Sequence, residues 1–170
     1  MNLYDIFTVM KKIVILILAA FLNHTAYTQV IPKWKMDDVV NYFSAKNDSV
    51  YVVNFWATFC KPCIAEIPGF IKIVKKYEGQ KVKLLLVSLD LPADYPNKIL
   101  AFVKKNNYAS SIVWLNETNA DHFCPMIDKS WSGAIPATII VNTKTGYRKF
   151  FEAELSQEEF EKELKTAVSR

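Results

Sequence analysis

Two cysteines separated by two residues carry the clearest chemistry in the sequence. Cys60 and Cys63 follow a continuous apolar and aromatic run, Val50–Trp56, and precede a segment with helical spacing. On a helix, residues three apart have Cβ atoms about 5–6 Å apart, which is close enough for a disulfide bond. The first turn of a helix carries a partial positive charge that stabilises a thiolate. The pattern therefore predicts Cys60 as an attacking thiolate and Cys63 as a resolving thiol.

The residues beside the two cysteines favour the same use. Pro62 fits the first turn of a helix, where its missing N–H group costs nothing, and Lys61 adds a positive charge next to the thiols. We expect Lys61 and Pro62 to contact the substrate, together with Phe59 and Trp56, which come just before the pair. Thiol–disulfide exchange needs only the sulfurs themselves, so no cofactor and no metal ion is expected.

A metal site is the first alternative use of the cysteine pair. His122 and Cys124 could complete a set of four ligands for zinc or copper, and the protein would then be a metal chaperone. The segment that carries them has no ligand spacing typical of a zinc site. A static disulfide is the second alternative, although such a small ring would stabilise the fold little. Cys124 by itself is expected to be a small, buried apolar residue.

A thiol peroxidase is the third alternative, with Cys60 as the peroxidatic residue. That motif requires a threonine three residues before the cysteine, whereas Thr58 stands two residues before Cys60. It also requires a proline earlier in the strand, and Val50–Trp56 contains none. The peroxidase is therefore the weaker enzyme hypothesis.

A strand and a helix must position the cysteines, and the hydrophobic pattern predicts both. Within the expected helix 61–77, the stripe that we expect to be buried consists of Ile64, Ile67, Ile71 and Val74. Strands alternating with helices, then a hairpin and a final helix, predict an α/β fold with a mixed sheet and helices on both faces. Helices are expected at 37–46, 61–77, 96–107, 121–131 and after a capping box of Ser156 and Glu159, and strands at 50–56, 82–89, 112–115, 138–141 and 147–151.

The first 28 residues have the pattern of a targeting segment. Lys11 and Lys12 precede ten apolar residues, Ile13–Leu22, which are too few to cross a bilayer because a spanning helix needs about 17 or more. A basic flank followed by a short apolar run is typical of a secretory signal peptide. We expect residues 1–28 to be removed on export, the alternative being an uncleaved anchor. Residues 29–170 are expected to form one domain outside the cytoplasm, in the periplasm or cell envelope.

The composition excludes other classes of protein. The chain has 170 residues, of which 51% are hydrophobic and 22% charged, values typical of one globular domain. The formal net charge is +4, and the basic residues are scattered along the chain. Binding to nucleic acid would require a basic patch, so no nucleic-acid partner is expected. We expect a monomer.

The segment Trp56-Ala-Thr-Phe-Cys60-Lys-Pro-Cys63 resembles the active site of the thioredoxin superfamily, in particular of its extracytoplasmic TlpA/ResA-like branch. Pro68 follows the second cysteine by five residues, where the active-site helix of the family is kinked by proline. Asn54 occupies a position that is acidic in thioredoxin itself. Glu66 matches the acidic residue of the ResA-like subgroup.

A second resemblance lies in Gly133–Val141, which is similar to the family loop whose cis proline faces the cysteines. It implies a cis peptide bond between Ile135 and Pro136, and substrate contacts from both residues. The resemblance covers about residues 48–170 and implies a thioredoxin-like fold, with an extra helix and strand at about 94–115. The helix expected on the N-terminal side of this region departs from the family, which usually has a β-hairpin there.

The resemblance implies a thiol–disulfide oxidoreductase. ResA-like relatives reduce disulfides outside the cytoplasm, some of them during cytochrome c maturation, and a pair without histidine between its cysteines resembles the reducing members. Such a reductase implies disulfide-bearing protein substrates and a membrane-embedded thiol electron donor. Glu66 stands one helical turn after Cys63, on the thiol side of the helix. We expect it to accept the proton of Cys63 during catalysis.

Overall fold

The computed structural model describes residues 10–11 and 30–169 of the chain. The expected signal peptide at 1–28 therefore lies outside the described residues, apart from Met10 and Lys11. Within the described part, no helix is both long enough and apolar enough to cross a membrane.

Within residues 30–169, six strands form one mixed sheet: β1 (Lys33–Trp34), β2 (Val50–Trp56), β3 (Val82–Ser88), β4 (Ser111–Leu115), β5 (Ala137–Asn142) and β6 (Tyr147–Phe151). The strand order is β1-β4-β3-β2-β5-β6, in which the pairs from β1 to β2 are parallel and the pairs from β2 to β6 are antiparallel. All seven residues of β2 are buried, which explains why its sequence is continuously apolar.

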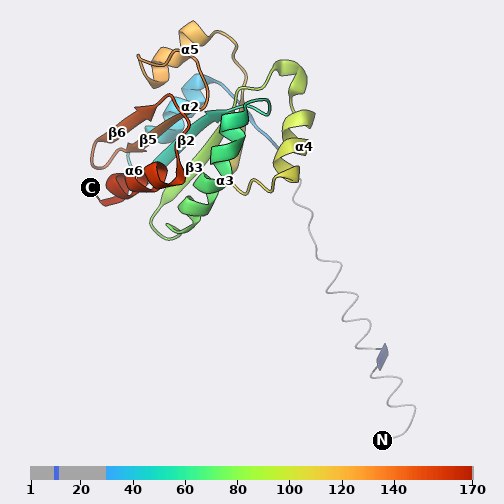
Figure 1. Ribbon diagram of the computed structural model, residues 1–170, viewed down its shortest axis with the longest axis horizontal. Helices are drawn as coiled ribbons and strands as arrows, with labels where there is room; N and C mark the ends of the chain where they lie inside the picture. Colours follow the sequence, from blue (N-terminus) through green and yellow to red (C-terminus); the bar gives the residue numbers. More distant parts are fainter. Residues whose placement is uncertain (1–9, 12–29, 170) are drawn as a thin grey trace, which may run out of the picture.

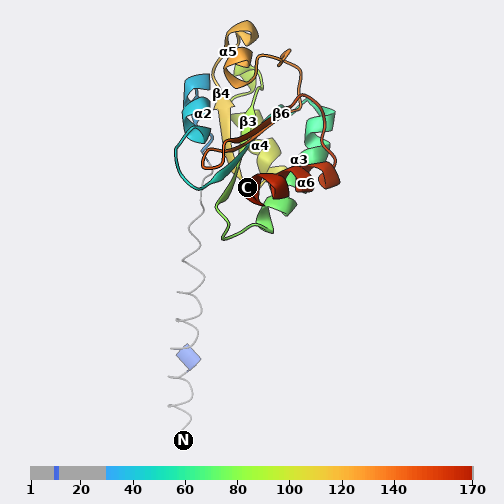
Figure 2. The same cartoon turned by 90° about the vertical axis from the view of Figure 1, so that its left-hand side faces the viewer.

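Helices cover both faces of the sheet, as the sequence predicts (Figures 1 and 2). One face carries α3 (Lys61–Lys75), α4 (Asn97–Lys105) and α6 (Gln157–Ser169), and the other carries α2 (Met36–Phe43) and α5 (Ala120–Ile127). Each face has its own hydrophobic core. The predicted extra helix and strand are α4 and β4, which follow the short 3-10 helix η1 (Pro92–Asp94). The α/β, thioredoxin-like fold class is confirmed.

The buried face of α3 differs from the predicted stripe. Ile67 is buried as expected, but Ile64, Ile71 and Val74 are only half-buried, and the fully buried side chains of the helix include Phe70 and Ile73. Apolar residues occupy most positions of this segment, so its periodicity fits more than one face. Phe70 decides the orientation because its ring stacks on that of Phe160 in α6, with 3.9 Å between the centroids.

Strand β1 is absent from the sequence prediction. A strand of two residues is too short to show an alternating pattern, and it is held in the sheet by its parallel pairing with β4. The predicted helix after it is present as α2, and the other strands end within one residue of their expected limits.

Candidate active site

The two cysteines form a disulfide bond at the point where β2 passes into α3 (Figure 1). Their Cα atoms are 5.3 Å apart. Cys60 is the residue that caps the start of α3, and its Sγ accepts a hydrogen bond from the backbone N–H of Cys63 at 3.3 Å. The expected geometry, a bridgeable pair at a helix start, is therefore confirmed. A thiolate at this position would receive the same N–H group and the positive end of the helix.

The two cysteine residues are not equally exposed. Cys60 is 7% exposed and Cys63 is 0% exposed. The Sγ of Cys60 also lies 3.7 Å from the carbonyl oxygen of Ile135. The peptide bond between Ile135 and Pro136 is cis, as the resemblance implies. An incoming molecule therefore reaches Cys60 first, beside the loop that carries the cis bond.

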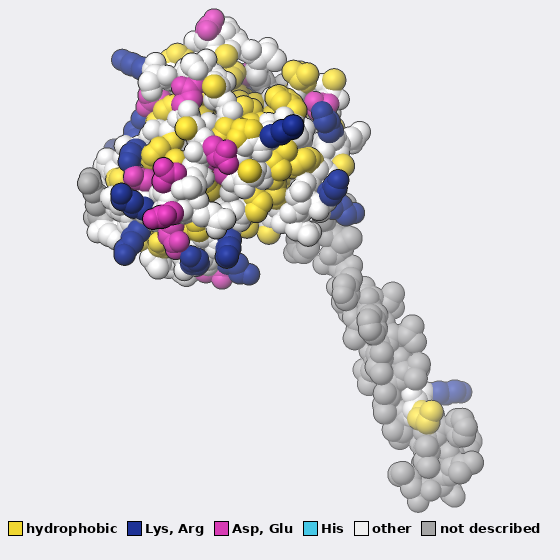
Figure 3. Space-filling view, in the orientation of Figure 1, with side chains coloured by type: hydrophobic (Ala, Val, Ile, Leu, Met, Phe, Trp, Pro, Cys, Tyr) yellow, Lys and Arg dark blue, Asp and Glu magenta, His cyan; other side chains and the backbone are white. Residues whose placement is uncertain are grey.

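Three of the residues expected to contact a substrate lie on the surface around the disulfide. Phe59 is 59% exposed, and Lys61 and Pro62 are also exposed. Ile135 is half-buried. Figure 3 shows hydrophobic side chains gathered on this face around the start of α3, whereas charged side chains crowd the part over α6. These four residues are placed where a bound protein could touch them.

Two other residues expected to contact substrate are buried instead. Trp56 has 0% exposure and packs against the rings of Phe102 and Tyr108, with centroids 5.8 Å and 5.7 Å away. Pro136 is buried as well. Neither side chain offers surface to a substrate in this structure, and contact of Trp56 and Pro136 with substrate stays a prediction. Trp56 is buried because its strand is central, so its alternate side chains point into one core or the other.

Glu66 is a buried carboxylate on the same helix as the cysteines. It is 4% exposed, and its two oxygens accept hydrogen bonds from the side-chain amide of Asn54 at 2.8 Å and from the backbone N–H of Leu155 at 2.9 Å. Burial raises the pKa of Glu66 to about 7, although both hydrogen bonds act in the opposite direction. The carboxylate can therefore gain or lose a proton near neutral pH.

Asn54 connects this carboxylate to the sheet. Its side-chain N–H group donates to Glu66 and also to the Thr138 hydroxyl at 3.0 Å, so that β2, α3 and β5 meet at one amide. The Oδ1 atom of Asn54 is buried and has no hydrogen-bond partner among the described residues. An amide cannot take up a proton at neutral pH, so Glu66 is the titratable member of this pair.

Asp90 is a residue supporting the site that the sequence analysis missed. It is 3% exposed and is the second residue after β3, and its carboxylate accepts the backbone N–H of Thr58 at 3.1 Å and the Thr58 hydroxyl at 2.5 Å. The Ser88 hydroxyl donates to the same carboxylate at 2.7 Å. Asp90 therefore fixes the loop that leads to Cys60. An acidic residue directly after a strand predicted to be buried is the signal that could have found it.

The alternatives to a redox pair gain little from the structure. Cys60 and Cys63 lie in one core, whereas Cys124 is a free, buried thiol in the core on the other face of the sheet. No cluster of three or more potential metal ligands occurs in the described residues. Burial raises the pKa of Cys124 to about 11, as suits a small apolar residue. The Thr58 hydroxyl donates to Asp90, so it is not directed at a peroxidatic Cys60.

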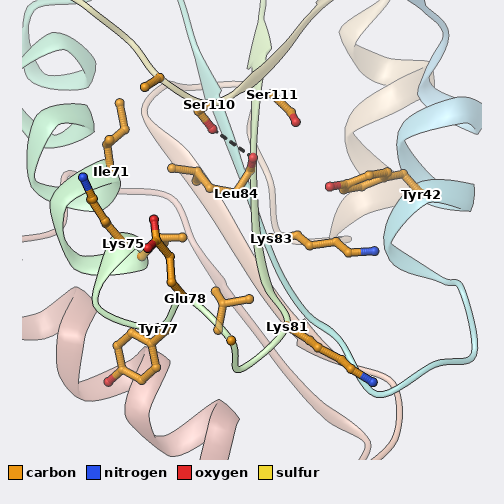
Figure 4. A pocket seen from close by; sticks show the side chains of 14 residues that line it. Tyr42, Ile71, Lys75, Tyr77, Glu78, Lys81, Lys83, Leu84, Ser110 and Ser111 are labelled. Carbon is orange, nitrogen blue, oxygen red and sulfur yellow. Dashed lines mark hydrogen bonds between the residues drawn. The ribbon is translucent and has the colours of Figure 1, made fainter.

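A pocket of about 750 Å³ lies at the opposite end of the sheet (Figure 4). It is formed where α3 ends and where β3 and β4 begin. Its lining includes Lys75, Lys81 and Lys83, together with Ser110, whose hydroxyl donates to the carbonyl oxygen of Leu84 at 2.9 Å. Neither active-site cysteine is part of it.

Comparisons with known proteins agree with this fold and find relatives named for thiol–disulfide chemistry. Residues 28–146 match the model of the AhpC/TSA family. The thiol-disulfide oxidoreductase ResA of Geobacillus kaustophilus is 22% identical over 173 residues, which cover 93% of this chain and 94% of that protein.

Two solved structures have a similar fold. A thioredoxin-related protein from Neisseria meningitidis serogroup B aligns with a TM-score of 0.58 and 28% identity, covering 74% of this chain and 86% of its own. A secreted disulfide oxidoreductase of Mycobacterium tuberculosis, described as homologous to DsbE of E. coli, aligns with a TM-score of 0.54 and 18% identity, covering 71% and 83%. The chain belongs to the AhpC/TSA family and has the fold of the thioredoxin superfamily.

Proposed function

We propose that this protein is a thiol–disulfide oxidoreductase that reduces disulfides of other proteins through Cys60 and Cys63. The observation that carries the proposal is a bonded cysteine pair at a helix start in which only Cys60 keeps any exposed surface. The ResA relative is named for the same activity. A structural disulfide would have no need for the cap hydrogen bond, the exposed residues Phe59, Lys61 and Pro62, and the buried carboxylate of Glu66 that surround this one.

The reaction begins from the reduced pair. The Cys60 thiolate attacks one sulfur of the substrate disulfide, a new S–S bond forms between protein and substrate, and the other substrate sulfur leaves as a thiolate that takes up a proton. Cys63 then loses its proton and attacks the Cys60 sulfur. The second substrate thiol is released and the Cys60–Cys63 disulfide forms, so two electrons have passed to the substrate. An external dithiol must return the pair to its reduced state.

Glu66 accepts the proton that Cys63 loses. Cys63 and Glu66 are three residues apart on the buried face of α3, a spacing that brings side chains to the same side of a helix. Cys63 has no exposed surface, so water is a poor acceptor for its proton. The pKa of Glu66, about 7, suits exchange with a thiol near neutral pH.

The protein works outside the cytoplasm and receives electrons from a membrane-embedded thiol donor. Support for the compartment comes from the signal-like pattern of residues 1–28 and from a similar fold in a protein described as secreted. Disulfides persist in oxidising compartments, where the reducing systems of the cytoplasm are absent. A reductase in such a compartment therefore needs electrons that cross the membrane.

Trapping of the mixed disulfide tests the proposal. Cys63→Ala removes the resolving thiol, so the variant should remain covalently bound to a disulfide-bearing protein such as intact insulin. Cys60→Ala removes the attacking thiol and should trap nothing, because Cys63 is buried. The products are separated on non-reducing gels. Equal trapping by both variants, or none by either, contradicts the assignment of roles.

A further inference from the structure

The loop between α5 and β5 carries a carbonyl group that faces the Cys60 sulfur. The carbonyl oxygen of Ile135 lies 3.7 Å from the Sγ atom of Cys60. When the disulfide is reduced, a Cys60 thiol at this position would donate its S–H group to that oxygen, and such a hydrogen bond favours the neutral thiol over the thiolate. The placement of this one carbonyl group therefore affects how readily Cys60 becomes a nucleophile.

A carboxylate from another part of the chain anchors this loop. Glu152 is the first residue after β6, and its Oε1 atom accepts the backbone N–H of Ser132 at 2.9 Å and that of Ala134 at 3.1 Å. The Ser132 hydroxyl donates to the same oxygen. These hydrogen bonds, above all the one from the Ser132 hydroxyl, hold the pKa of Glu152 below its ordinary value. The anchor is therefore ionised at neutral pH.

The backbone of the loop explains why a negative charge fits there. Gly133 has a φ of +94°, a conformation that glycine adopts far more readily than other residues. It stands between Ser132 and Ala134, whose N–H groups converge on Glu152. Backbone N–H groups that converge at such a turn form a concave site for an anion. Since β5 and β6 pair in antiparallel fashion up to Thr138 and Phe151, the residue after β6 is delivered to this site.

A second anchor holds the loop from the side of the core. The indole N–H of Trp131 donates to the carbonyl oxygen of Ala134 at 2.8 Å. The Trp131 ring is buried, and its centroid lies 4.6 Å from that of Phe55 in β2. Both the N–H and the carbonyl group of Ala134 are thus hydrogen-bonded. This leaves the next residue, Ile135, little freedom to move away from the sulfur.

We propose that Glu152 is a positioning residue: by anchoring the loop it holds the Ile135 carbonyl against the Cys60 sulfur, and it thereby limits the share of reduced Cys60 that is thiolate. The rate of attack on a disulfide depends on that share, so the loop moderates the reactivity of the protein. The inference rests on the proposed function, since the thiolate matters for catalysis only if Cys60 attacks a substrate disulfide.

Other charged groups act on Cys60 from the elements around it. Lys61 on α3 favours the thiolate, whereas the carboxylates of Glu66 on α3 and Asp90 after β3 oppose it when they are ionised. Glu152 carries a negative charge as well, so its charge must be separated from its hydrogen bonds. Glu152→Gln does this, because an amide oxygen still accepts N–H groups but has no charge.

The test measures the ionisation of Cys60 in the reduced full protein. Alkylation by iodoacetamide is followed from pH 5 to 10, and mass spectrometry of the peptides separates Cys60 from the buried Cys63 and Cys124. At pH 6 we expect Glu152→Ala to react about fivefold faster than the wild-type protein, since the thiol loses one hydrogen bond. Glu152→Gln should stay within about twofold of the wild type. At pH 10 the rates should converge, because the thiol is then ionised in every variant.

Trp131→Phe removes the second anchor and keeps most of the ring contacts, so it should also accelerate alkylation at pH 6, by about threefold. It keeps the test decisive if Glu152→Ala folds poorly. Glu158→Ala is the matched control, because Glu158 is an exposed acidic residue in the first turn of α6; its rate should equal that of the wild type.

Three results overturn the inference. An unchanged rate in Trp131→Phe or in folded Glu152→Ala makes the anchors purely structural. Equal acceleration in Glu152→Ala and Glu152→Gln assigns the effect to charge alone. The same acceleration at every pH assigns it to easier access. Alkylation needs no protein substrate, so failure of the wild-type protein to reduce intact insulin overturns the proposed function, whereas the expected alkylation rates still support the anchored loop.

Discussion

The two ends of the sheet are held together in different ways. At the end that carries the disulfide, the carboxylates of Glu66 and Asp90 are buried, and each accepts hydrogen bonds from both backbone and side-chain donors. At the other end, the pocket in Figure 4 is lined by exposed lysines. An ion pair on the surface joins Lys81 to Asp48 there. The carboxylates at the disulfide end are therefore buried and hydrogen-bonded, whereas the charged side chains at the pocket end are exposed to solvent.

This difference shows that the volume of a pocket does not identify the active site of this protein. The pocket of about 750 Å³ lies away from the thiols, although a large concave site is the usual first hypothesis for an active site. The reacting end is marked instead by buried charge and by the raised pKa of Glu66. Its substrates are proteins under the proposed function, and a protein docks on a surface and does not need a deep cavity.

The largest expected effect is the loss of folding stability when the buried carboxylate of Asp90 is removed. Asp90→Ala leaves the N–H and hydroxyl of Thr58 and the hydroxyl of Ser88 buried without their acceptor, so the free energy of unfolding should fall by about 4 kcal/mol. Urea denaturation followed by circular dichroism measures it. Asp48→Ala, at the solvated end, should leave the unfolding midpoint unchanged. A small loss for Asp90→Ala would mean that Asp90 does not anchor the loop.

The next largest effect is a slower resolution of the mixed disulfide when Glu66 is replaced. Glu66 accepts a proton only when it is ionised, so the rate in the wild-type protein should rise with pH through about 7. Glu66→Gln should be slower by about a hundredfold at pH 8 and should lose this rise. Asn54 can turn its unpartnered Oδ1 toward the new amide, which preserves the fold. Stopped-flow kinetics from pH 6 to 9 measure the rates, with Glu78→Gln at the far end as the control.

The same variant has a second signature in stability. Burial raises the pKa of Glu66 from its ordinary value of 4.5 to about 7, so between these values the folded state holds a proton that the unfolded chain has lost. The stability from this group is therefore complete below pH 4.5 and is lost as the pH rises through about 7. Glu66→Gln should remove that slope. Rates equal to those of the wild-type protein, with the slope removed, would leave Glu66 buried but without a role in proton transfer.

The smallest expected effect concerns two lysines at opposite ends of α3. The reduction potential of the Cys60–Cys63 pair should lie well below the −120 mV of the most oxidising relatives, because no histidine stands between the cysteines. Lys61→Ala removes a positive charge that favours the thiolate, and the potential should become more negative by about 10 mV. Lys75→Ala, at the far end of the helix, should leave it unchanged. Equilibration with glutathione or dithiothreitol buffers measures the potentials of the wild-type protein and of both variants. A wild-type value near −120 mV would mean that the protein oxidises thiols and does not reduce disulfides.

Local patterns predicted the reactive pair and most of the elements around it. Cys60 and Cys63 are close because they are three residues apart on a helix, and β2 is recognisable because its central position demands a continuous apolar run. Trp56 is the last residue of that run, so its burial follows from the same pattern, whereas the expectation that it contacts substrate came from its place beside the cysteines.

The residues that the sequence did not reveal act across long separations. Asp90 binds Thr58 over 32 residues, and the amide of Asn54 reaches Thr138 over 84 residues. No spacing within one element records such contacts; they exist only after β2 has paired in parallel with β3 and antiparallel with β5.

The N-terminal cap position of Cys60 ties its reactivity to the completion of folding. The sulfur accepts the Cys63 N–H only when α3 has formed, and the loop before it is fixed only when β3 has brought Asp90 into place. Pairing of distant strands is a slow step of folding. The unfolded chain therefore carries two thiols of ordinary reactivity, and Cys60 becomes strongly nucleophilic only after folding. This order limits thiol–disulfide exchange with other unfolded chains while the protein is being made.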